Sequence, residues 1–196
     1  DRYGALCTAC HNPRNWSRSA HANSPATGTG MGTKPWASNS NGSVAENGCE
    51  NCHRTHAAPH PQRLLANAQE TRVCLTCHDG SVAVKYLEGE FFKFSAHPIF
   101  ATNWIHDEKE GLNTMVRHVT CTDCHNPHQA SAIPAAPPLV PGPLDGVSGI
   151  TISGGTISKA NYEYEVCLKC HGIRDQTTSG IVRQDNVRNI RLKISL

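Results

Sequence analysis

The stretch CTDCHNPH, Cys121–His128, places two cysteines and two histidines within eight residues. The same eight-residue pattern occurs as CENCHRTH at Cys49–His56. Thiolate sulfur and imidazole nitrogen are common protein ligands of transition metals. Both stretches therefore predict metal-binding sites, and the second histidine of each stretch, three residues beyond the first, needs an explanation of its own.

One cysteine spacing recurs along the whole chain. All ten cysteines fall into Cys-x-x-Cys pairs, and a histidine follows each pair at once. Histidine makes up 12 of the 196 residues, and five such histidines by chance have a probability of about one in a million, whereas Cys-x-x-Cys-His is the attachment signature of c-type haem. We number the motifs as sites 1 to 5. Their cysteines are Cys7 and Cys10, Cys49 and Cys52, Cys74 and Cys77, Cys121 and Cys124, and Cys167 and Cys170; their histidines are His11, His53, His78, His125 and His171.

Two other uses of paired cysteines fit less well. Zinc ribbons take Cys-x-x-Cys pairs two at a time, and five pairs leave one without a partner. Cysteines three residues apart also form redox disulfides, but the chain lacks the βαβ pattern in which such motifs occur. We therefore predict five covalently attached haem c groups. In each, the two thiols add to the haem vinyl groups and the motif histidine binds the iron.

The composition indicates an interior filled by something other than side chains. Aromatic residues make up 6% of the chain, which also contains 16 Gly and 12 Pro, so side chains alone would form a thin core. We predict mostly coil, short helices at the haem sites and few short strands, with the haem stack as the core. Residues 22–47 and the proline-rich residues 131–149 predict loops. Gly149–Ser158 predicts a short hairpin, and residues 181–196 predict a lone strand.

A loose internal repeat divides the chain. The first part of the chain contains, in order, site 1, a Ser-Ala-His ending at His21, and CENCHRTH. The next part contains, in the same order, site 3, a Ser-Ala-His ending at His97, and CTDCHNPH. We predict a first two-haem module at residues 1–60 and a second at 61–130. Residues 131–196 hold a Pro/Gly-rich loop, the fifth site and the tail, and all three parts pack as one haem-cored unit. VCLKCHG at site 5 echoes VCLTCHDG at site 3, so site 5 is interpreted as the start of a further module.

Histidines outside the motifs are predicted to supply the second axial ligands. His21 and His97 stand in matching Ser-Ala-His contexts between two sites. His56 and His128 each lie three residues past a motif histidine, which predicts the same short helical face. From there neither can reach the opposite side of its own haem, but each can reach the iron of a neighbouring haem.

The remaining ligand assignments follow by position. His118, three residues before Cys121, is the predicted ligand for the extra, fifth haem. His60 and His106 are left with solvated or propionate-bonding roles. Met31 and Met115 are alternative ligands, and a Met/His haem would have a raised potential.

Charge and hydropathy bear on partners and location. The formal charge is +2, but five haems bring about ten propionates and about +1 for each oxidised core, giving about −3 oxidised and about −8 reduced. Nothing in the sequence indicates nucleic acid. The sequence contains no run of 18 apolar residues, so it does not predict a membrane-spanning helix. Haem c is attached outside the cytoplasm and the sequence begins at Asp1, so we expect a secreted protein, extracellular or at the cell surface, with a periplasmic one as the alternative.

The motifs resemble a known family. CENCHRTH, CTDCHNPH, VCLTCHDGSVA, SAHP, RHVTCTDCHNPH and YEYEVCLKCHG are similar to segments of the doubled-CxxCH multihaem c-type cytochromes, well over residues 70–172 and loosely over 1–60. The resemblance extends to subunits of extracellular cytochrome filaments. It implies a continuous haem stack and one distal histidine donated by an adjacent subunit. The last module is unfinished, and a Ser-Ala-His occurs early in the chain. Because one subunit could complete the next, we expect a head-to-tail homo-oligomer, with His21 favoured as the inter-subunit ligand.

Three functions remain open from the sequence. The leading expectation is an electron-transfer protein, not an enzyme, that polymerises into a conductive extracellular filament. It would work with redox partner proteins or an extracellular acceptor. The alternative is a soluble, monomeric periplasmic pentahaem shuttle that donates to a reductase. A catalytic multihaem enzyme such as a nitrite reductase fits less well, because that family usually has one motif with lysine in place of histidine.

Overall fold

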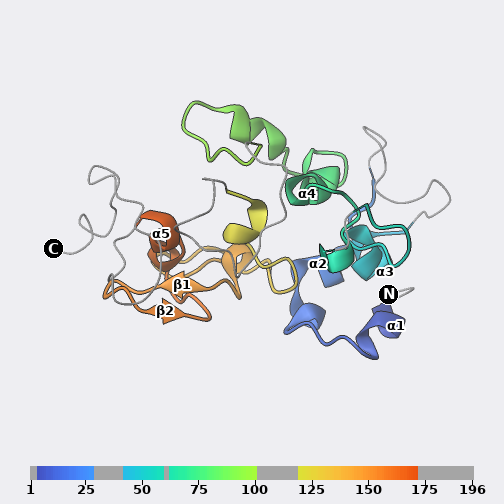
Figure 1. Cartoon of the computed structure of the whole chain (residues 1–196), viewed down its shortest axis with the longest axis horizontal. Coiled ribbons are helices and arrows are strands. Elements are labelled where there is room, and N and C mark those ends of the chain that lie inside the picture. The colour runs from blue at the N-terminus through green and yellow to red at the C-terminus, as the bar shows by residue number, and fades with distance from the viewer. Residues whose placement is uncertain (1–3, 29–41, 60–61, 101–118, 172–196) are drawn as a thin grey trace. The chain divides into compact units, whose positions relative to one another are not determined.

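The computed structural model describes residues 4–28, 42–59, 62–100 and 119–171. Their backbone is mostly coil with short helices and one small sheet, which confirms the predicted fold class (Figure 1). The described residues fall into two compact units, residues 4–100 with 119–123 and residues 124–171. Within these ranges no helix is long and apolar enough to span a bilayer. The division into two-haem modules stays a prediction.

The regular elements of the first unit are short helices and turns, and four of them carry the cysteine motifs. The α-helices are α1 (Gly4–Thr8), α2 (Ala20–Asn23), α3 (Val44–Asn47) and α4 (Glu70–His78); the 3-10 turns are η1 (Trp16–Arg18), η2 (Gly48–Asn51), η3 (Gln62–Leu64), η4 (Glu88–Phe92) and η5 (Cys121–Asp123). Sites 1 to 4 begin within α1, η2, α4 and η5. Helix at these sites was predicted from the motif spacing.

Helix α3 lies in a segment that the sequence predicts as loop. Its first turn is held by a capping box, in which the Glu46 N–H donates to Ser43 Oγ at 3.2 Å and the Ser43 N–H donates to Glu46 Oε2 at 2.6 Å. This pair satisfies two N–H groups that have no partner inside the helix. Helix α3 packs against α2 (Figure 1), so the segment folds because of its cap and its neighbour.

The second unit contains the predicted hairpin. Strands β1 (Gly149–Ile150) and β2 (Thr156–Ile157) pair antiparallel, with Gly149 opposite Ile157 and Ile150 opposite Thr156. Helix α5 (Glu163–His171) packs against β1 (Figure 1), and the turn η6 (Gly142–Leu144) precedes the hairpin. Glu165 caps α5 by accepting from the N–H groups of Asn161 at 2.7 Å and Tyr162 at 3.0 Å.

The side-chain core is small, and large apolar side chains stay outside it. One buried cluster is formed by Leu65 and Val73, and another by Val147, Ala160 and Val166. By contrast, Val84 and Phe94 are fully exposed, and the exposed fractions of Leu6 and Phe92 are 79% and 70%. Apolar surface of this extent is typical of a site that binds another apolar group. It is compatible with the prediction that haem completes the core.

Several predicted features fall outside the described residues. They are the tail strand at 181–196, the histidines His60, His106 and His118, and the methionines Met31 and Met115. Their assignments stay predictions.

Gly146 provides a test of the second unit. Its φ is +77°, and a Cβ at this position would clash with the side chain of Gln129. We expect Gly146→Ala to lower the free energy of unfolding by about 1 kcal/mol or more, because the backbone is strained and Gln129 is displaced. The matched control is Gly155→Ala, whose Cβ would meet Thr151 Oγ1 at 3.4 Å, an ordinary contact. Denaturant midpoints measured by circular dichroism compare the two, and equal midpoints would contradict this account of Gly146.

Candidate haem-binding sites

Four of the five motifs take one of two backbone forms. Sites 3 and 5 occupy the last five residues of the nine-residue helices α4 and α5. Sites 1 and 2 are single turns, closed by an N–H of the motif histidine that donates to the carbonyl of the first cysteine, at 2.8 Å for His11 and Cys7 and at 2.9 Å for His53 and Cys49. Site 4 begins in η5. In the helical and single-turn forms a helical bond brings the histidine back over the first cysteine, as attachment to one haem requires.

The second histidines do not lie on a helical face, which corrects the sequence prediction. At site 2 the 3-10 turn ends at Asn51, and His53 enters an isolated bridge with Leu65 before His56 is reached. At site 4 the turn ends at Asp123, and the Asn126 side chain accepts from the His128 N–H at 3.1 Å. Such a local bond favours a turn over a continued helix. The prediction that His56 and His128 bind neighbouring irons is untested and stays a prediction.

The motif histidines of sites 2 and 4 are oriented in the same way. Nδ1 of His53 lies 2.7 Å from the carbonyl oxygen of Arg63, and Nδ1 of His125 lies 2.9 Å from that of Pro143. A carbonyl oxygen only accepts, so Nδ1 carries the proton and Nε2 has a lone pair for a metal. A bond of this kind fixes the ring and increases its basicity as a ligand. The orientation suits an axial haem ligand.

The cysteines also suit haem attachment. All ten are free thiols, so each pair is available for two thioether bonds. Together with the Nδ1 bonds at sites 2 and 4 and the exposed apolar side chains, this donor set fits haem c. The predicted cofactor-binding cysteines and proximal histidines are therefore compatible with the structure, although none has been tested by it.

Cysteines from different sites contact each other in pairs. The Cys49 thiol hydrogen-bonds Cys7, and the pKa of Cys49 is raised by burial and further by this neighbour. The Cys74 thiol donates to Cys121, which raises the pKa of Cys74 well above its ordinary value and lowers that of Cys121. The contacts join site 1 to site 2 and site 3 to site 4. Each is made by the first cysteine of both motifs.

The second cysteines of sites 2 and 3, Cys52 and Cys77, have raised pKa values because they are buried. Burial raises the pKa of Cys52 to about 11. Burial, with the charges of Cys52 and Asp79, raises the pKa of Cys77 to about 12. Both thiols stay protonated at neutral pH. A protonated thiol is a poor nucleophile in disulfide exchange, so we expect both groups to react slowly in such exchange.

One apolar contact also occurs twice. Cys52 packs against Leu65 and Val73, and Cys124 packs against the cluster that includes Val166. Val73 and Val166 each precede the first cysteine of a helical site. The contacts therefore also join site 2 to site 3 and site 4 to site 5, a grouping that the sequence repeat did not indicate.

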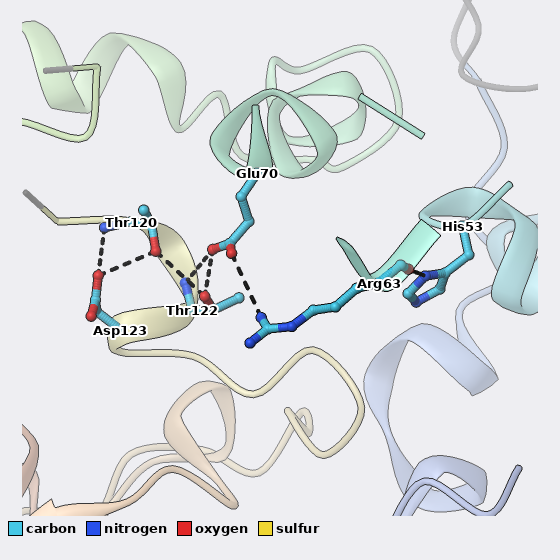
Figure 2. Close-up of polar contacts among 6 residues, drawn as sticks. All are labelled: His53, Arg63, Glu70, Thr120, Thr122 and Asp123. Atoms are coloured by element: carbon cyan, nitrogen blue, oxygen red, sulfur yellow. Dashed lines mark hydrogen bonds and ion pairs between the residues drawn. The ribbon is translucent and has the colours of Figure 1, made fainter. Parts of the chain in front are cut away.

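A buried glutamate connects three sites. Glu70, which is 3% exposed, begins the helix of site 3. Its carboxylate accepts from the Thr122 hydroxyl and, at 3.3 Å, from the Thr122 N–H at site 4. It also lies 4.0 Å from the guanidinium of Arg63, whose carbonyl accepts from His53 (Figure 2).

The turn of site 4 has its own support. Asp123 Oδ2 accepts from the Thr120 N–H at 2.7 Å and from the Thr120 hydroxyl at 3.2 Å (Figure 2). Sequence reasoning missed both this pair and Glu70. The spacing of Thr120 and Asp123 was a readable capping signal, whereas the partner of Glu70 lies 52 residues away along the chain.

The predicted distal histidines lie in unlike surroundings. His21 is in α2, and its ring centre lies 6.2 Å from that of His78, with the planes at 84°. His97 is exposed in coil. The two Ser-Ala-His segments also differ, because Ser19 is fully buried and caps α2 whereas Ser95 is exposed in a turn. The matching sequence contexts therefore do not correspond to matching structures.

Comparison with known proteins identifies one family motif. The family described as doubled CXXCH motif matches residues 41–83, which contain sites 2 and 3. No curated protein and no solved structure matches the chain. The match supports a multihaem c-type cytochrome with covalently bound haem c, and a role in electron transfer rather than catalysis.

Replacing the buried glutamate tests its connecting role. We expect Glu70→Gln to lower the free energy of unfolding by about 1–3 kcal/mol, because charge-assisted hydrogen bonds to Thr122 are weakened in a buried position. The matched control is Glu90→Gln, which removes an exposed ion pair with Lys93 and should change stability by less than about 1 kcal/mol. Denaturant unfolding of both holoproteins gives the comparison. A Glu70 variant as stable as the control would show that the network contributes little.

Proposed function

We propose that this protein is a pentahaem c-type cytochrome that passes electrons along a row of bis-histidine haems. Each haem, when bound, supplies an iron that takes up and releases one electron. The observation that carries the proposal is the contact between attachment cysteines of different sites, Cys7 with Cys49 and Cys74 with Cys121. Because each cysteine would bond to the edge of a porphyrin, cysteines in contact would bring two porphyrin edges close together.

Closeness of the edges matters because electron tunnelling weakens steeply with distance. Cys52 packs against the cluster that includes Val73, and Cys124 packs against the cluster that includes Val166, which extends the sequence of neighbouring sites. Sites 1, 2, 3 and 4 are then joined in order within the first unit, and sites 4 and 5 within the second. The chain supports a path through all five sites in sequence order.

The side chains would hold the irons in one coordination state. The carbonyls of Arg63 and Pro143 orient the motif histidines of sites 2 and 4, which leaves Nε2 of each available to bind iron. The predicted second ligands His21, His56, His97, His118 and His128 provide one histidine for each remaining position. An iron with two histidines has no open position for substrate, which favours transfer over catalysis.

The haem content and spin state test this proposal. We expect the mass of the intact holoprotein to equal that of the polypeptide plus five haems, since no motif lacks a cysteine or a histidine. The ferric spectrum should be entirely low-spin, and the ferrous protein should not bind carbon monoxide rapidly. Fewer than five haems would contradict the stoichiometry. Rapid binding of carbon monoxide would reveal an open iron and favour a catalytic role.

We propose further that the subunits polymerise head to tail into an extracellular filament. The sequence resemblance supports this part, and a heterologous contact that does not close gives a filament. The sequence favours His21 as the ligand that crosses between subunits. However, His21 contacts His78 in the same chain, which favours a different histidine as the ligand between subunits. The exposed His56 and His97 are candidates for that ligand.

Electron microscopy of the purified holoprotein distinguishes the two forms of the proposal. Filaments with a regular subunit repeat are expected. Monodisperse single subunits at all concentrations would refute polymerisation and leave the soluble periplasmic shuttle, while the haem content and spin state would be unaffected.

A further inference from the structure

The ring centres of His21 and His78 lie at the separation expected for two imidazole ligands of one metal. Their centres are 6.2 Å apart and their planes are nearly perpendicular, at 84°. Two imidazoles bound in line to one metal have ring centres about 6.3 Å apart, from metal–nitrogen bonds of about 2.0 Å and about 1.15 Å from each nitrogen to its ring centre. The observed separation therefore matches a shared iron.

The identity of the two residues supports interpreting this separation as that of two ligands of one iron. Edge-to-face contacts between aromatic rings also occur at such distances, so the distance alone does not decide. His78, however, is the motif histidine of site 3 and terminates the helix that carries Cys74 and Cys77. A second imidazole at ligand distance from a motif histidine is what a six-coordinate haem requires.

We propose that His21 is the second axial ligand of the haem at site 3, within the same chain. This inference rests on the proposed function, because it assumes a haem at Cys74, Cys77 and His78. It differs from the role between subunits that the sequence favours. It also makes the iron a cross-link between the predicted first and second modules.

The local structure around His21 supports a fixed ligand. Ser19 is fully buried, and its Oγ accepts from the Ala22 N–H at 3.1 Å, which caps α2. The Asn23 side chain donates to the carbonyls of Ser17 and Ser19, both at 2.9 Å. A ligand carried on a capped helix loses little further backbone entropy when it binds a metal.

Backbone hydrogen bonds also hold the segment that follows α2. The Val44 N–H donates to the Ala26 carbonyl at 2.9 Å, and the Ala45 N–H donates to the Ser24 carbonyl at 3.0 Å. These bonds fasten the segment after α2 to α3, which packs against α2. His21 is thus presented from a supported helix rather than from a loose loop, in contrast to the exposed His97.

The ring planes predict a spectroscopic signature. Axial ligands set the electronic structure of the iron, and perpendicular imidazole planes leave two of its d orbitals nearly equal in energy. Ferric haem of this kind gives a strongly anisotropic low-spin electron paramagnetic resonance signal. We expect one such signal from site 3 in the wild-type holoprotein.

The test compares His21→Ala with His60→Ala in the full-length holoprotein. His60 is the matched control because the sequence leaves it without a ligand role. In His21→Ala we expect one haem of the five to become high-spin, the anisotropic signal to disappear and one ferrous haem to bind carbon monoxide. Added imidazole should restore the low-spin state. The control should retain five low-spin haems.

A second variant keeps the test decisive if His21→Ala fails to assemble. His21→Met retains a ligand, so one haem should remain low-spin with the charge-transfer band of methionine–iron ligation and a raised potential. Five unchanged bis-histidine haems in either His21 variant would overturn the assignment. In that case a fully low-spin wild type with five haems would leave the proposed function standing.

The oligomeric state separates the two possible roles of His21. If His21 binds within its own chain, wild-type protein diluted to single subunits stays fully low-spin. If His21 instead binds a haem of the neighbouring subunit, the wild type gains a high-spin haem only when its subunits dissociate. The His21→Ala variant then shows the same high-spin haem before dissociation. Too few haems in the wild type would refute the proposed function itself, whatever the behaviour of the variants.

Discussion

A carboxylate removed from water needs hydrogen bonds to replace those it has lost, and Glu70 finds them in parts of the chain that are distant in sequence. Thr122 donates from site 4, and Arg63 contributes its charge beside the carbonyl that orients His53. The positions of sites 2, 3 and 4 therefore depend on satisfying one buried charge. A chain with little apolar core relies on such polar links to specify its arrangement.

The sequence predicted the local features well because their causes are local. The short helices at the motifs and the hairpin at Gly149–Ser158 depend on residues within a few positions of each other. The fold class followed from composition, since a chain with few large apolar side chains builds few regular elements. These features are the ones that the structure confirms.

Features set by distant or competing contacts were not predicted. Helix α3 forms because Ser43 and Glu46 cap it and α2 packs on it, although its composition indicated a loop. His128 leaves the expected helical face because Asn126 bonds its N–H. The contact between His21 and His78 joins residues in different predicted modules. No spacing rule relates two such positions, so only the folded chain brings them together.

The contacts between Cys7 and Cys49 and between Cys74 and Cys121 also affect how the protein matures. Free thiols at this separation are substrates for oxidation, and one disulfide would deprive two haems of an attachment point at once. Outside the cytoplasm, where disulfides form readily, attachment of the first haem of each pair competes with this reaction. The closeness that would serve electron transfer in the proposed cytochrome would thus make haem attachment sensitive to the redox conditions of the compartment.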